Sequence, residues 1–168
     1  MDIVLVLLRL IHILAAVAWV GMGITMMLYI GPAAGAAGES GLRFMKSLTG
    51  RTGFVRAIPA AAGITVLAGI LLYLVGNAAS HFSQVGNMML GAGAIVGIVA
   101  IVHGGAVTGR ATQALAKALA EQVPDDGPIP ADALPNLRQL SMTLASHSRI
   151  SVILTIIALI AMGSARYL

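Results

Sequence analysis

The sequence predicts an all-α fold, namely a bundle of four transmembrane helices with both chain termini on the outer face of the membrane. Hydrophobic residues make up 58% of the 168 residues and charged residues only 10%, whereas soluble domains carry about 25% charged residues. Four apolar runs reach the roughly 20 residues that a helix needs to cross about 30 Å of hydrocarbon. Abundant glycine and alanine allow such helices to approach one another closely.

The four predicted spans belong to a single domain that covers the whole chain, residues 1–168. The first run is closed by Gly31-Pro32. It is too long for a cleaved signal peptide, so we expect a retained helix. The spans cover about residues 3–30, 54–75, 85–109 and 147–166.

Basic residues predict the orientation of the spans. Eight of the ten lie in or beside the two connections that follow the first and third spans, and the connection 77–84 contains no Lys or Arg. Because loops rich in Lys and Arg stay in the cytoplasm, both connections are predicted to be cytoplasmic. The chain is therefore expected in the cytoplasmic (inner) membrane of a bacterium. The eight residues are Arg43, Lys46, Arg51, Arg56, Arg110, Lys117, Arg138 and Arg149.

The two cytoplasmic connections contain further helix signals. "ESGLRFMKSL", residues 39–48, predicts a short interfacial helix. Residues 109–123 predict that the third helix extends into the cytoplasm, and the prolines of residues 124–130 end it. Residues 131–148 then lead helically into the fourth span.

Histidines are the main candidates for chemistry, because an ionisable group inside a span is costly and marks a functional site by default. His12 lies one turn after Arg9, in the outer half of the first span. His103 lies seven residues before Arg110, about 10 Å inside the inner boundary. His147 falls where the fourth span leaves the inner surface, and His81 lies in the outer connection.

These placements predict a site for haem b, which needs one or two imidazoles, small neighbours for the macrocycle and cations near its propionates. His12 paired with His81, and His103 paired with His147, would hold two haems. A single haem between His12 and His103 is an alternative, and so is a histidine that merely hydrogen-bonds a neighbouring helix. Arg56 and Arg110 are the cations predicted to face the propionates. Small or aromatic residues share the His12 face at helical spacing: Ala15, Ala16, Trp19 and Gly23.

Copper is a second candidate cofactor. Met22, Met26 and Met27 follow His12 in the first span, and thioether and imidazole groups suit Cu(I). Methionines also fill irregular gaps in apolar cores, so both interpretations stay open. The metal ligands predicted for haem or copper are His12, His81, His103 and His147.

Several classes of function are excluded. The chain has no cysteine, which excludes disulfides, thiolate sites and covalently attached haem. The net charge of +4 is scattered around apolar spans and does not indicate nucleic-acid binding. No carboxylate lies within a span, which argues against a carboxylate-driven proton pump.

Two stretches carry a family resemblance. "LRLIHILAAVAWVG" and "RAIPAAAGITVLAGILLYL" resemble the small four-helix integral membrane proteins of the copper-resistance D (CopD)-like group. His12, Trp19 and Gly21 match an H-x6-W-x-G pattern in the first helix. The resemblance implies a histidine-bearing bundle that handles haem, electrons or copper, with His12 as the residue carried over.

The first helix is also similar to HemJ-type protoporphyrinogen oxidases. Those enzymes carry a basic and aromatic run at the end of helix one and a lysine in helix three. This chain has Tyr29-Ile30-Gly31-Pro32 at the first place and no lysine in the third span. The departure speaks against that enzyme activity.

Together these observations predict a cytochrome-like membrane subunit more than a stand-alone enzyme. It would bind haem b through some of His12, His103 and His147 and exchange electrons with quinone or a partner complex. The alternatives are a cofactor-free accessory or assembly subunit, within a larger membrane complex or a homo-oligomer, and a copper-handling membrane protein.

Overall fold

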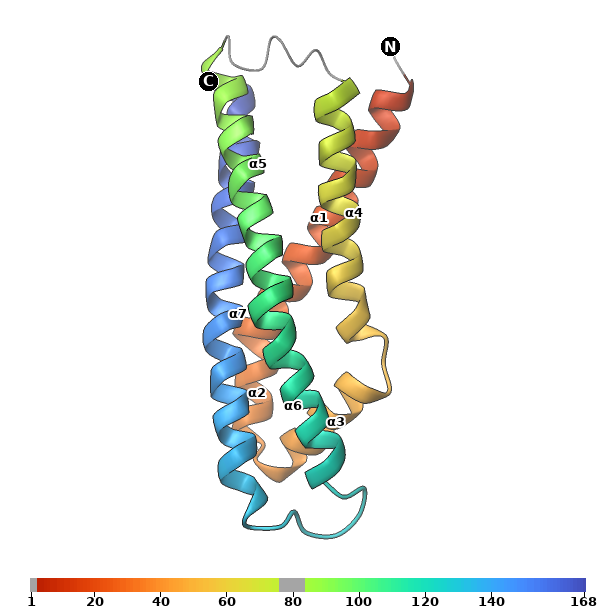
Figure 1. The fold of residues 1–168 in the computed structure, drawn as a ribbon, viewed down its shortest axis with the longest axis vertical. Coiled ribbons are helices and arrows are strands. Elements are labelled where there is room, and N and C mark those ends of the chain that lie inside the picture. Colours follow the sequence, from red (N-terminus) through yellow and green to blue (C-terminus); the bar gives the residue numbers. More distant parts are fainter. Residues whose placement is uncertain (1–2, 76–83) are drawn as a thin grey trace.

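The structure is a computed structural model that describes residues 3–75 and 84–168, and every regular element in these residues is helical. Four rods are long and apolar enough to cross a membrane, which confirms the predicted all-α class and the four spanning helices. Figure 1 shows both chain ends at one end of the bundle, here named the terminal end. The opposite end is named the loop end. The rods are Ile3–Ala36, Phe54–Val75, Val85–Gln122 and Ala133–Tyr167.

The first rod joins α1 (Ile3–Thr25), a π-helical turn η1 (Met26–Ile30) and α2 (Gly31–Ala36). The prediction that Gly31-Pro32 closes this helix was wrong. Proline lacks an N–H and its ring crowds the carbonyl four residues back. The wider turn of η1, in which the Gly31 N–H bonds the Met26 carbonyl, precedes Pro32 and places it in the first turn of α2, where proline is tolerated.

The other rods follow the sequence closely. The second is α4 (Phe54–Val75), with the bounds predicted for the second span. The third joins α5 (Val85–His103), a π-helical turn η3 (Gly104–Thr108) and α6 (Gly109–Gln122). The fourth joins α7 (Ala133–Ser164) and a final 3-10 turn η4 (Ala165–Tyr167). The predicted helical continuations of the third and fourth spans are thus present, and residues 39–48 lie in α3 (Glu39–Gly50).

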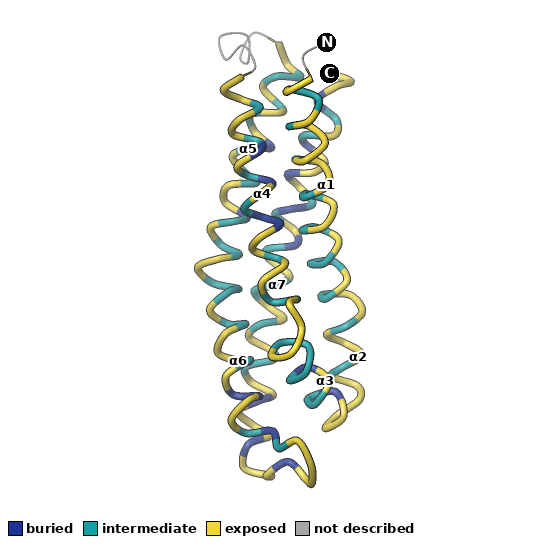
Figure 2. Tube along the Cα trace, turned by 90° about the vertical axis from the view of Figure 1, so that its right-hand side faces the viewer, coloured by how far each residue is buried: buried dark blue, intermediate teal, exposed yellow. Residues whose placement is uncertain are grey.

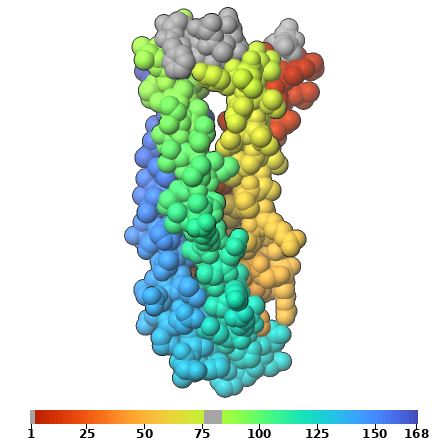
Figure 3. All heavy atoms as spheres, in the orientation of Figure 1, coloured from red at the N-terminus to blue at the C-terminus, as the bar shows by residue number. Residues whose placement is uncertain are grey.

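The rods pack as two pairs. α1 runs along α4 and α5 runs along α7 (Figure 1). Gly93 sets the α5–α7 spacing, since a Cβ there would lie 2.7 Å from Met162 Cγ and 3.2 Å from the Ala158 carbonyl oxygen. Small residues allow this close approach in lipid. Figure 3 shows an opening between α4 and α5 in the terminal half, so the two pairs are separated there.

The rods differ in length, and the surplus gathers at the loop end. α4 has 22 residues, about 33 Å at the helical rise, which matches the thickness of bilayer hydrocarbon. The other rods have 34, 38 and 35 residues. Their extra turns pack with α3 at the loop end (Figure 1). We name this region the loop-end cap: α3, α6, the connection 123–132 and the first turns of α7.

The loop-end cap holds the best-buried side chains among the described residues, Leu119, Leu137 and Val123. Figure 2 shows this group of buried residues at the loop end. No residue of α1 is buried, and side chains such as Leu14 and Val17 are 67% and 66% exposed. The rods therefore offer apolar surface to a lipid bilayer, whereas the cap has a hydrophobic core of its own.

Gly41 tests the packing of the cap. A Cβ at Gly41 would overlap the backbone carbonyl of Ala34 in α2, and a backbone group cannot rotate away. We expect Gly41→Ala to lower the free energy of unfolding by about 1–3 kcal/mol or more, since 1–3 kcal/mol is the usual cost of overpacking. The change should appear as a lower midpoint in thermal unfolding followed by circular dichroism in detergent.

The matched control is Gly50→Ala in the same helix. A Cβ at Gly50 meets no atom within 4 Å, and alanine favours a helix more than glycine does. The midpoint of Gly50→Ala should equal or exceed that of the wild type. Equal midpoints for both variants would contradict the close α2–α3 contact.

Candidate functional site

His12 lies between α1 and α4. Its Nδ1 is 2.7 Å from the backbone carbonyl oxygen of Thr65 in α4. Gly69, one turn further along α4, makes room for the ring, because a Cβ there would lie 3.0 Å from His12 Cε1. The surface of α4 is thus shaped to receive this imidazole.

The hydrogen bond to Thr65 fixes the proton on the His12 ring. A carbonyl oxygen only accepts, so Nδ1 carries the hydrogen and donates it. In the neutral ring, Nε2 is then the nitrogen with a free lone pair. An Nδ1–H donated to a backbone carbonyl is a common way to orient a metal-ligating histidine. His12 is therefore prepared to bind an iron or another metal through Nε2.

The surroundings of His12 partly match the expectation. Ile11 and Ile13 point outward and are 47% and 55% exposed. Arg9, three residues before His12, is exposed and lies on the same side of α1 at this helical spacing. Sequence reasoning took Arg9 only as an interface marker. The predicted small-residue face is half-buried: Ala15, Ala16, Trp19 and Gly23.

The two cations predicted for haem propionates lie away from His12. Because α1 and α4 are antiparallel and His12 contacts Gly69, Gly23 is level with the first turn of α4, which contains Arg56. That level is about 16 Å from His12 along α1. Arg110 follows η3 in α6, on the other helix pair. Arg9 is thus the cation closest to His12 along the first rod.

His103 and His147 form a second site. Their ring centroids are 6.1 Å apart and their planes differ by 63°. His103 is the last residue of α5, and His147 lies in α7. The structure thus brings together two histidines that the sequence paired. We name them the neck histidine pair, because they lie where the rods enter the loop-end cap.

A chain of hydrogen bonds supports His103. Its Nδ1 lies 2.9 Å from Ser151 Oγ in α7, and Ser151 Oγ lies 2.9 Å from Thr108 Oγ1. In the π turn η3 each backbone hydrogen bond joins residues five apart. Thr108, five residues after His103, therefore lies on the same face of the helix as His103. These contacts join α5 and η3 to α7 directly.

His147 has an unusual buried atom. Its Nδ1 is buried and has no hydrogen-bond partner among the described residues. An unpaired buried polar atom costs about 1–3 kcal/mol, and native structures rarely keep one without a function. His147 Nδ1 is therefore available as a ligand or proton acceptor.

The levels of the histidines differ from the expectation. His103 was predicted about 10 Å inside the boundary and His147 at the surface, but both lie at one level. His12 lies at a different level. Gly23 of α1 packs against Val152, the neighbour of Ser151 in α7, since a Cβ placed on Gly23 would lie 3.4 Å from Val152 Cγ2. Since His12 is about 16 Å further along α1, His12 and His103 are too far apart to ligate one iron.

The remaining predicted ligands do not join these sites. Met22, the nearest helix-one methionine, is about 15 Å from His12 along the helix, and Met26 packs against the core of the loop-end cap. One Cu(I) ion cannot bind His12 and these methionines together. His81 lies outside the described residues. Within the described ranges no three His, Asp or Glu side chains converge on a possible metal position.

Sequence reasoning missed an ion-pair clamp in the loop-end cap. Arg43 donates to the backbone carbonyls of Pro124, at 2.5 Å, and Gly127. Lys46 donates to Asp125 Oδ1 at 2.8 Å and to the Val123 carbonyl at 2.6 Å. The sequence contained both partners, namely basic residues three apart on a predicted helix and the acidic turn "PDDG". They lie far apart in the chain, so no local sequence pattern predicts that they pair.

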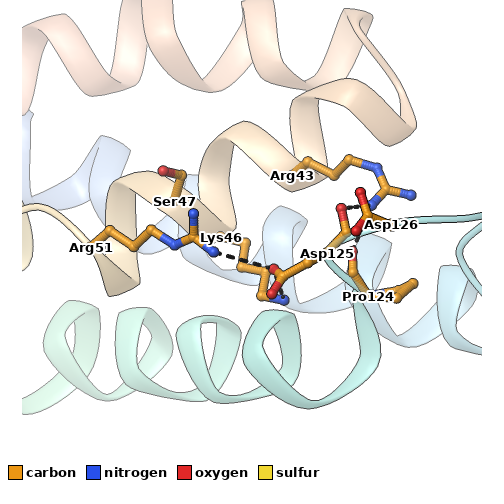
Figure 4. A pocket seen from close by; sticks show the side chains of 7 residues that line it. All are labelled: Arg43, Lys46, Ser47, Arg51, Pro124, Asp125 and Asp126. Atoms are coloured by element: carbon orange, nitrogen blue, oxygen red, sulfur yellow. Dashed lines mark hydrogen bonds and ion pairs between the residues drawn. The ribbon is translucent and has the colours of Figure 1, made fainter.

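The clamp surrounds a cavity of about 300 Å³ in which α3 side chains face the connection (Figure 4). The hydrogen bond and charge of Lys46, aided by Arg51 at 3.4 Å, hold the pKa of Asp125 below its ordinary value of 3.8. The side chain of Asp125 is 65% exposed, so water screens these interactions. The cluster fastens α3 to the connection and has the character of a structural contact.

A scan of family models, a search of curated proteins and a search of solved structures each find no match to this chain. The CopD-like resemblance therefore rests on the sequence patterns alone.

Asp125 generates a pH-dependent prediction. Because its pKa is lowered in the folded state, its ion pairs stabilise the fold above the ordinary pKa, and this contribution is lost as the pH falls through the lowered value. Asp125→Asn should lower the thermal midpoint at pH 7, and the difference from the wild type should shrink below pH 3.8 and in high salt.

Asp126→Asn is the control, since Asp126 forms no ion pair in the part of the chain that the structure describes. Its midpoint should follow that of the wild type. A constant difference between Asp125→Asn and the wild type at every pH would show that charge is not the cause.

Proposed function

We propose that the chain is a cytochrome-like membrane subunit that binds haem b through His12 and exchanges electrons with a quinone or a partner complex. The observation that carries this proposal is the 2.7 Å contact between His12 Nδ1 and the Thr65 carbonyl, which leaves Nε2 as the free nitrogen. The CopD-like pattern around His12 points in the same direction.

The residues around His12 fit the group. Gly69 makes room for the imidazole, the Thr65 carbonyl orients it, and exposed Arg9 supplies a cation at helical spacing. Haem, when bound, supplies one-electron redox chemistry. Among the described residues His12 is the histidine at this level, so it is the ligand that these residues would supply. The predicted second ligand, His81, lies outside the described residues.

The neck histidine pair does not fit a haem. The Ser151 hydroxyl joins α7 to His103 and Thr108 at 2.9 Å in each contact. These direct contacts between α7 and the third rod leave no space for a flat macrocycle between the two rings. We therefore assign haem to His12 alone.

The competing proposal is an accessory subunit without a cofactor. Gly21, Gly63 and Gly91 lie in the rods, and a Cβ at each would meet no atom within 4 Å. Such uncovered small residues suit packing against helices of a partner. Copper bound by His12 together with helix-one methionines finds no support in this geometry.

The haem proposal predicts a spectrum that depends on His12. Protein purified in detergent from haem-supplied cells should show Soret and α bands in a reduced-minus-oxidised spectrum. His12→Ala should abolish the bands, since the axial nitrogen is lost. His103→Ala and His147→Ala should keep them.

Two glycine variants sharpen this test. Gly69→Ala places a methyl group 3.0 Å from the His12 ring and should weaken or shift the bands. Gly63→Ala in the same helix, where a Cβ meets no atom within 4 Å, should leave them unchanged. A haem-supplied wild type without either band would contradict the proposal and favour the accessory subunit.

We further propose that the loop-end cap lies in the cytoplasm and the terminal end faces outward, because the basic residues gather at the loop end. Since the chain has no cysteine, single cysteines report on each side. Tyr167→Cys, at a residue 83% exposed, should react with a membrane-impermeant maleimide in intact cells. Asp126→Cys should react only after the membrane is opened, and the reverse pattern would invert the topology.

A further inference from the structure

The neck histidine pair is unused by the proposed function, and its chemistry is that of a metal site. We infer that His103 and His147 bind a divalent first-row transition-metal ion, such as Zn²⁺ or Ni²⁺, with two imidazole ligands and solvent completing the coordination. This site is separate from His12 and does not depend on haem.

The separation of the rings fits one shared ion. An imidazole nitrogen binds such a metal at about 2.0–2.1 Å, and the ring centroid lies about 1.1 Å behind the nitrogen. Two rings on one ion therefore have centroids about 5.1 Å apart at a tetrahedral angle and about 6.3 Å apart when they lie on opposite sides of the ion. The observed 6.1 Å fits the nearly opposite arrangement, and a tetrahedral ion would draw the two rings about 1 Å closer. The 63° between the planes is compatible, because a shared ion fixes the positions of the two nitrogens and not the angle between the ring planes.

The available nitrogens also fit. His147 Nδ1 is buried and without a partner, so it has a lone pair to give. His103 Nδ1 contacts Ser151 Oγ, and when it donates its hydrogen there, Nε2 is the free nitrogen. Ser151 then donates to Thr108 Oγ1. A hydrogen-bond acceptor in this position orients a ligating imidazole, and the Ser151 hydroxyl oxygen is such an acceptor.

The charges around the neck histidine pair and the number of ligands determine the metal affinity that we expect. The one described carboxylate in the rods, Glu121, lies 18 residues after His103 and pairs with Lys117. Exposed Arg149 lies two residues after His147, so the ion keeps its positive charge at this site. Imidazole suits Zn²⁺ and Ni²⁺, but two neutral ligands bind more weakly than the three or four of a typical zinc site.

The experiment uses the full chain in detergent, purified without a polyhistidine tag and freed of metal with a chelator. Isothermal titration with Zn²⁺ should show one ion per chain, and X-ray absorption should show two imidazole nitrogens. His103→Gln and His147→Gln should each weaken binding at least tenfold. His12→Gln removes the other candidate metal ligand and should still bind one ion at the neck histidine pair. Ser146→Ala, at an exposed residue of α7, is the matched control and should bind as the wild type does.

Ser151→Ala keeps both imidazoles and covers the case in which a histidine variant fails to fold. Loss of the orienting hydroxyl should weaken Zn²⁺ binding about 10-fold or more. Absence of Zn²⁺ binding by the wild type would overturn the inference. So would binding that survives in both neck variants, or that is lost in His12→Gln.

Discussion

The buried core of the loop-end cap is the constraint on which the arrangement of the rods depends. Lipid tails are as apolar as the side chains of these helices, so moving a side chain from lipid to a helix contact gains no hydrophobic free energy. Helices in lipid therefore associate through van der Waals packing and polar contacts. α1 accordingly buries no residue. In the cap, by contrast, Leu119 and Leu137 are fully buried and belong to a contiguous hydrophobic core. Arg43 and Lys46 then fasten the connection to α3, so the cap joins the two helix pairs.

Within the rods, glycines set the distances that matter for the two histidine sites. Gly93 brings α5 close to α7, and the same register places His103 beside Ser151. Gly69 lets the His12 ring approach α4 until its Nδ1 reaches the Thr65 carbonyl. The positions of the imidazoles are therefore consequences of helix packing, and each ring keeps one nitrogen for another partner.

Local patterns predicted most of the helices, because apolar length and helix propensity are properties of neighbouring residues. The second span, α3 and the helical run before His147 were all readable in this way. The π turns were not, since one extra residue in a turn depends on what the helix packs against. The pairing of Lys46 with Asp125 joins residues 79 positions apart, and no local pattern contains it. The shared level of His103 and His147 was not predicted because the α5–α7 register depends on the contact at Gly93.

The cap and the opening give the two histidine sites different mechanical surroundings. The neck histidine pair lies next to the cap, in rods joined by hydrogen bonds through Ser151. The two rings are therefore held close together by the packing of α5 against α7. His12 lies in the other pair, about 16 Å along α1 from that level. There α4 and α5 stand apart (Figure 3). The His12 site thus lies in the half of the bundle where the two helix pairs are separated, away from the buried contacts of the cap.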